Sequence, residues 1–165
     1  MEITRANILV AITAFCIFCN CSRPIRNSDY VSIDPMVGWQ SDSIISLSLE
    51  FPYDSLQALD LYITLQILNN HLLTKEDEIV LDIDFISPKE HNYFDSVELP
   101  IAGTGSGTRM EKKNGIIELS VPYIKNIKNR ETGIWTFNIK KNISCKASNN
   151  IIGLGLFYKT RKNER

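Results

Sequence analysis

The sequence has few of the residues that usually build catalytic or metal centres. Its 165 residues include four cysteines and only two histidines. The histidines, His71 and His91, lie outside any metal-binding spacing such as H-E-x-x-H, and no G-x-S-x-G nucleophile motif occurs. Cys145 has no general base that the sequence identifies, so we interpret it as a free or buried thiol. We therefore expect a protein that is not an enzyme, with no catalytic residue, no metal ligand and no cofactor.

An excess of one charge is absent as well. The chain holds 18 basic and 19 acidic residues, which gives a formal net charge of -1, and the two signs are interspersed. This balance argues against a nucleic-acid partner and against a polybasic membrane-binding segment. The acidic run Glu76 to Glu78 and the pair Asp82 and Asp84 are interpreted as solvated faces, because carboxylates adjacent in sequence seldom converge on one cation.

The longest uncharged apolar run is too short to cross a bilayer. It extends from Ile8 to Cys19, whereas a membrane-spanning helix needs roughly 20 apolar residues. Its length after Arg5 is that of a signal-peptide core, and polar sequence with Pro24 follows. We interpret residues 1–20 as a lipoprotein signal peptide and Cys21 as the lipidation site, with a plain secretory leader as the alternative. The expected location is the cell envelope, lipid-anchored on the periplasmic side of the outer membrane.

Beyond the leader, the chain changes to a period of two. Residues 21–37 show little periodicity and are predicted to form a tether, and the basic segment Lys159 to Arg165 is interpreted as a frayed tail. Between them, apolar and polar residues alternate as in strands with one face on a core. The runs are Ile45 to Phe51, Leu61 to Ile67, Ile79 to Phe85, Asp95 to Ile101, Ile117 to Val121, Trp135 to Ile139 and Ile152 to Leu156.

Turn-forming sequences separate these runs. Examples are Ser87-Pro88-Lys89 and Asn114-Gly115. The spacing predicts an all-β domain over residues 38–165, an antiparallel β-sandwich of about seven strands. The stretch Leu56 to Leu73 also fits an amphipathic helix, but its unbroken alternation and β-branched residues favour a strand.

Two features are candidate binding elements. Trp39 stands at the junction of tether and domain, where we expect an exposed aromatic side chain. Gly103, Gly105 and Gly107 lie in a glycine-rich loop that lacks the Lys-Ser/Thr of a phosphate-binding loop, so it is interpreted as a flexible contact surface between strands. Trp135, in contrast, belongs to the inward face of a strand and is expected in the core.

The mature chain resembles the gliding-motility lipoprotein family GldH. The segments that carry this resemblance are Gly38-Trp39, Asp42-Ser43, Leu61 to Leu65, Asp95-Ser96 with Leu99 and Ala102, Gly133 to Ile139, and Ile152 to Leu156. The resemblance implies a divergent member of a family of small anchored β-domain proteins. It implies a non-enzymatic accessory lipoprotein that supports gliding motility and type IX secretion by scaffolding or stabilising a partner among the envelope proteins of that apparatus.

A different class of function stays open beside this one. A surface or periplasmic carbohydrate-binding lipoprotein would share the leader and the β-sandwich, but it would need exposed aromatic side chains on which sugars stack. The aromatic residues Trp39, Tyr53, Tyr62, Tyr123 and Trp135 are candidates for such a platform.

Overall fold

The computed structural model describes nine strands. It covers residues 27–52, 57–68, 78–100, 107–128, 131–142 and 150–161. The strands are β1 (Ser28–Ser32), β2 (Ile44–Phe51), β3 (Leu59–Leu68), β4 (Glu78–Ile86), β5 (Asn92–Pro100), β6 (Arg109–Lys113), β7 (Ile116–Ile127), β8 (Gly133–Lys141) and β9 (Ile151–Thr160).

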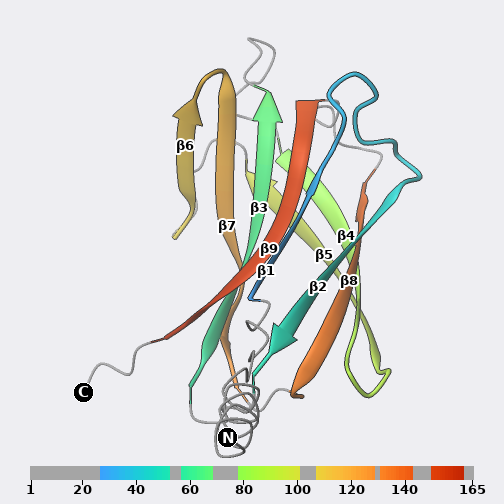
Figure 1. The fold of residues 1–165 in the computed structure, drawn as a ribbon, viewed down its shortest axis with the longest axis vertical. Helices are drawn as coiled ribbons and strands as arrows, with labels where there is room; N and C mark the ends of the chain where they lie inside the picture. The colour runs from blue at the N-terminus through green and yellow to red at the C-terminus, as the bar shows by residue number, and fades with distance from the viewer. Residues whose placement is uncertain are drawn as a thin grey trace, which may run out of the picture.

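Two antiparallel sheets face each other as the layers of a sandwich (Figure 1). One sheet has five strands in the order β1-β9-β3-β7-β6, and the other has four in the order β2-β8-β4-β5. This arrangement confirms the predicted antiparallel β-sandwich. Within the ranges given above, no helix is long and apolar enough to cross a membrane.

The core lies between the two sheets and is built from every second residue of the central strands. Leu61, Ile63, Leu65 and Ile67 of β3 are all almost fully buried, while the residues between them are half-exposed on the outer face. Each such aliphatic side chain contributes about 2 kcal/mol when it leaves water. The alternation of apolar and polar residues therefore fixes which face of each strand points inward. The alternative interpretation of Leu56 to Leu73 as a helix is wrong for residues 59–68, which form β3.

Strand β1 corrects the predicted tether. Residues 28–32 pair with β9 in register from Ser28 opposite Phe157 to Ser32 opposite Gly153. Gly153 and Gly155 make room for Tyr30, since a Cβ added to Gly153 would lie 1.8 Å from the Tyr30 hydroxyl oxygen. The segment is therefore the edge strand of the five-stranded sheet, and its Tyr30 side chain lies over Gly153 and Gly155 on the outer face of β9.

Hydrogen bonds to β2 link the two sheets along one side: the Tyr158 hydroxyl of β9 donates to the Glu50 backbone oxygen at 3.0 Å, and a carboxylate of β1 contributes a second bond. Asp29 of β1 accepts a hydrogen bond of 2.8 Å from the Ser48 backbone N–H of β2. An unpaired backbone N–H at a sheet edge can pair with a strand of another molecule. Asp29 bonds one such N–H of β2, so this part of the β2 edge is blocked.

All seven predicted strands are present, and each is longer than the alternation alone indicated. Ile101, the last residue predicted for β5, lies outside the described residues. β1 and β6 were missed. Their sequences, Ser-Asp-Tyr-Val-Ser and Arg-Met-Glu-Lys-Lys, are mostly polar because both strands lie at a sheet edge. The predicted frayed tail is also wrong at its start, since Lys159 and Thr160 belong to β9.

Candidate functional site

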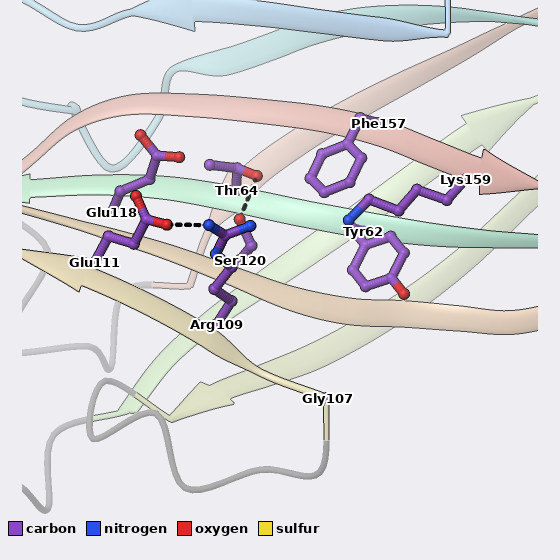
Figure 2. Close-up of a pocket in the computed structure, with 9 residues that line it drawn as sticks. All are labelled: Tyr62, Thr64, Gly107, Arg109, Glu111, Glu118, Ser120, Phe157 and Lys159. Carbon is purple, nitrogen blue, oxygen red and sulfur yellow. Dashed lines mark hydrogen bonds and ion pairs between the residues drawn. The ribbon is translucent and has the colours of Figure 1, made fainter.

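A groove of about 470 Å³ lies on the outer face of the five-stranded sheet (Figure 2). We call it the outer-face groove. Its residues come from β3, β6, β7 and β9 and from Gly107, which precedes β6. They point outward because their strand neighbours, such as Leu61 and Leu119, fill the core. The lining residues are Tyr62, Thr64, Gly107, Arg109, Glu111, Glu118, Ser120, Phe157 and Lys159.

One half of the outer-face groove is aromatic. Tyr62 and Phe157 are opposite each other on β3 and β9, and their rings stack with centroids 4.9 Å apart and planes 4° from parallel. The Lys159 ammonium nitrogen lies 5.3 Å from the centre of each ring. A cation at this distance is attracted to the electron-rich ring faces, so it helps to hold both side chains in place.

The other half is polar, as Figure 2 shows. The hydroxyl oxygens of Thr64 and Ser120 are 3.1 Å apart across β3 and β7. Arg109 pairs with Glu111 along β6. Glu118 accepts a 3.3 Å hydrogen bond from the Gln66 amide. The groove thus offers hydrogen-bond donors and acceptors side by side, held on paired strands.

A buried carboxylate closes the aromatic end of this face. Asp60 of β3 accepts hydrogen bonds from the Asn126 backbone N–H at 2.8 Å and from Arg161 at 3.0 Å. Burial alone would raise the pKa of Asp60, but these bonds and the positive charges of Arg161 and Lys125 outweigh burial and lower it. Asn126 has a positive φ of 61°, so the Asp60 carboxylate secures a backbone conformation that is uncommon for a non-glycine residue.

A second concave site opens at one end of the sandwich, between the sheets. We call it the aromatic cleft; its volume is about 330 Å³. Trp135 lies at its centre, with ring centroids 5.8 Å from Phe51, 6.3 Å from Phe85 and 6.1 Å from Tyr93. The lining residues are Phe51, Leu61, Phe85, Tyr93, Ile124, Ile127, Lys128, Glu131, Trp135 and Phe137.

The rim of the aromatic cleft is polar. The Glu131 carboxylate is 3.1 Å from His91 Nδ1 and accepts a hydrogen bond of 3.2 Å from the Lys89 backbone N–H. A hydrogen bond from the Ser87 side chain, with those from His91 and Lys89, lowers the pKa of Glu131. The Glu131 backbone oxygen accepts a 3.0 Å bond from the Trp135 indole N–H, which fixes the orientation of that ring. The cleft is therefore an apolar hollow with an ordered polar edge.

Strand β5 lies at the edge of the four-stranded sheet, next to this cleft. In the hairpin that joins β4 to β5, the Ser87 N–H donates to the His91 oxygen at 2.9 Å. Hydrogen-bonded pairs alternate in antiparallel ladders, so the odd-numbered residues of β5 bond to β4. The backbone groups of Phe94, Ser96 and Glu98 then point away from β4, and no strand in the described ranges pairs with them.

The structure places the predicted binding residues in different parts of the molecule. Trp39 was expected to be exposed, but it is only 3% exposed and belongs to the core. Gly38, with a φ of 69°, ends the turn before it, and the indole N–H donates to the Ser43 oxygen at 3.1 Å. A turn that folds back over the core leaves no period-two signal, so the sequence did not reveal the burial.

Gly107 does line the outer-face groove, with a φ of 89° that favours glycine. Gly103 and Gly105 lie outside the described residues, as do Cys21, Cys145 and His71. His91 lies on the surface, as expected. No group of three or more potential metal-ligating side chains occurs in the part of the chain that the structure describes.

Sequence reasoning named Tyr62 as a possible sugar platform but missed its partner Phe157. It also missed Lys159, which was assigned to the tail. All three lie on the outward side of their strands' alternation, and Tyr62 and Phe157 could have been noticed because aromatic residues are unusual there. The pattern gives the face of each residue, whereas only strand pairing places Phe157 beside Tyr62.

The chain matches no family model and no curated protein sequence. Among solved structures, it is similar to a carbohydrate-binding module, CBM28, specific for non-crystalline cellulose. The TM-score is 0.36 and the identity 10%, over 79% of this chain and 71% of that one. At this level of similarity, the module carries no argument about the function of this protein.

Proposed function

We propose that this protein is a non-enzymatic accessory lipoprotein of the cell envelope, which binds and stabilises a protein of the gliding and type IX secretion machinery. The observation that carries the proposal is the open edge of β5 beside the aromatic cleft. The resemblance to the gliding-motility lipoproteins supports the partner class, and the predicted signal peptide over residues 1–20, with lipidation at Cys21, supports the location.

The open edge supports binding of an extended protein segment. The backbone groups of Phe94 and Glu98 are free of the β4 ladder, and a partner strand laid along β5 would pair with them. Phe94 itself is 67% exposed on the outer face of the sheet. Main-chain pairing supplies affinity in such complexes, while side-chain pockets supply specificity.

The aromatic cleft supplies a pocket at the right place. Tyr93 belongs both to β5 and to the cleft lining, and it is 44% exposed. An apolar side chain of the partner segment would enter the cleft against Tyr93 and Trp135. Removing such a side chain from water is the usual source of binding energy at an interface centre.

The test uses the full-length tagged protein, purified from membranes of its own host and analysed by mass spectrometry. The Ser96 backbone N–H points away from β4 and donates to the Asp95 carboxylate at 2.9 Å, a bond that a partner strand would replace. Ser96→Pro removes this N–H, so the partner strand loses a bond while the pairing of β5 with β4 is kept. Ser96→Ala is the matched control, because it removes the same hydroxyl, which donates to Asp82 at 2.8 Å, but keeps the N–H.

We expect wild-type protein and Ser96→Ala to recover gliding or secretion components, and Ser96→Pro to lose them. Equal recovery by Ser96→Pro would reject docking on β5. An acylated peptide at Cys21 and release of Cys21→Ala from membranes are expected as well. A Cys21→Ala protein that stays membrane-bound would reject the lipid anchor.

A further inference from the structure

The outer-face groove takes no part in the proposed docking. It lies on the outer surface of the five-stranded sheet, whereas β5 belongs to the other sheet. We propose that this groove binds a neutral carbohydrate, a short run of pyranose units laid across β9, β3 and β7 toward β6. The inference goes beyond the proposed function and rests only on the groove itself.

The charges of the groove favour a neutral ligand. Arg109 and Lys159 are balanced in number by Glu111 and Glu118. The Arg109 guanidinium is paired with Glu111, so its charge is already compensated. Glu111 and Glu118 are directly opposite on β6 and β7, and a phosphate or another polyanion would meet this pair of negative charges.

The aromatic half matches one face of a sugar ring. Tyr62 and Phe157 both line the groove, and their stacking holds the two rings in one orientation. The stacked rings cover each other's inner faces, so a sugar would contact the outer ring faces and the ring edges. The C–H groups on a pyranose face carry a small positive charge, which the ring face attracts, and their contact removes apolar surface from water. The Lys159 ammonium group, 5.3 Å from the centre of each ring, helps to hold both rings in place. It also carries N–H donors that a sugar oxygen would accept.

The polar half matches the sugar hydroxyls. A hydroxyl group both donates and accepts, and so do the hydroxyls of Thr64 and Ser120. Arg109 supplies donors, while Glu111 and Glu118 supply acceptors. A volume of about 470 Å³ falls within the ordinary range of small-molecule sites.

The groove is also built on rigid elements. Tyr62 faces Phe157, and Thr64 faces both Ser120 and Gly155, in continuous antiparallel register. Side chains on paired strands lose little freedom when a ligand binds, which reduces the entropic cost of association.

The experiment screens the full-length protein, held in detergent, against an array of neutral and acidic oligosaccharides. Titration calorimetry with the best neutral hexasaccharide then gives the affinity. Phe157→Leu keeps an apolar side chain on β9 but removes the ring, and we expect an affinity at least about tenfold lower. Tyr62→Phe keeps the ring and is expected to retain most of the affinity.

The matched control is Ile134→Ala, which removes an apolar side chain, 62% exposed, from β8 of the other sheet. Its sugar affinity is expected to equal that of the wild type. The inference is overturned if no neutral oligosaccharide binds, if only acidic glycans bind, or if a peptide displaces the sugar-binding signal. Equal affinity of Phe157→Leu and wild type would overturn it too, provided that both unfold at similar temperatures.

Discussion

Two adjacent residues of β3 serve two opposite sites. Leu61 is fully buried and lines the aromatic cleft between the sheets, while Tyr62 lines the outer-face groove. The cleft is mostly apolar, so its residues contribute to folding as well as to the proposed binding. The groove lies outside the core, and its residues contribute little to folding. Because successive residues of a strand point to opposite faces, substitutions in the outer-face groove should affect stability less than substitutions in the aromatic cleft.

One effect on stability is expected where the Tyr30 side chain covers the outer face of β9. In Gly153→Ala the new Cβ would overlap the outer end of the Tyr30 side chain, which would have to swing away and lose its hydrogen bond to Gln66. We expect a loss of about 1–2 kcal/mol in the free energy of unfolding. In a Tyr30→Ala background the same substitution should cost less than about 1 kcal/mol, since the clash is gone. Urea titrations of the four proteins measure this. If Gly153→Ala cost the same free energy of unfolding in the Tyr30→Ala background, the Tyr30 side chain would not lie over Gly153.

The next effect compares the cleft with the groove directly. Trp135→Ala removes a ring packed against Phe51 and Phe85 and should lower the free energy of unfolding by about 2–3 kcal/mol. Phe157→Leu in the groove should lower it by less than about 1 kcal/mol. Denaturant midpoints of both variants test the comparison. Equal losses would mean that the groove is as much a part of the folding core as the cleft.

A smaller effect concerns Asp60, whose folded-state pKa is lowered by Asn126 and Arg161 despite burial. A lowered pKa means that the ionised form stabilises the fold above about pH 4, and this contribution disappears as the pH falls through the folded-state pKa. Asp60→Asn should cost about 1–2 kcal/mol at neutral pH and should flatten the acid side of the stability profile. Thermal unfolding from neutral to about pH 3 measures both. An unchanged acid profile would refute this role.

The smallest effect on stability is expected at the polar end of the groove. Arg109 is largely exposed, and its pair with Glu111 lies in solvent. Arg109→Gln should therefore change the free energy of unfolding by less than about 0.5 kcal/mol. It should weaken sugar binding by about threefold, because one amide replaces a charged donor group. If the free energy of unfolding fell by more than the free energy of sugar binding, Arg109 would serve the fold more than the groove, which would contradict this prediction.

The sequence predicted the class of fold and most strands because their signal is local. In β2 and β3 every second residue is apolar, and this pattern is readable without knowledge of any other strand. The edge strand β6 gave no such signal, since Met110 is its only apolar residue and an edge strand covers little of the core. The strand β1 was mistaken for a tether for the same reason.

Candidate sites were harder to predict, because they depend on pairs of distant residues. By itself, the sequence determined which face of each strand points inward, since alternation places apolar residues on one side. Only the tertiary structure decided that Phe157 lies beside Tyr62, that Trp39 folds into the core, and that β5 ends its sheet. Strand order and register are set by long-range packing across the sandwich, and no local pattern in the chain encodes them.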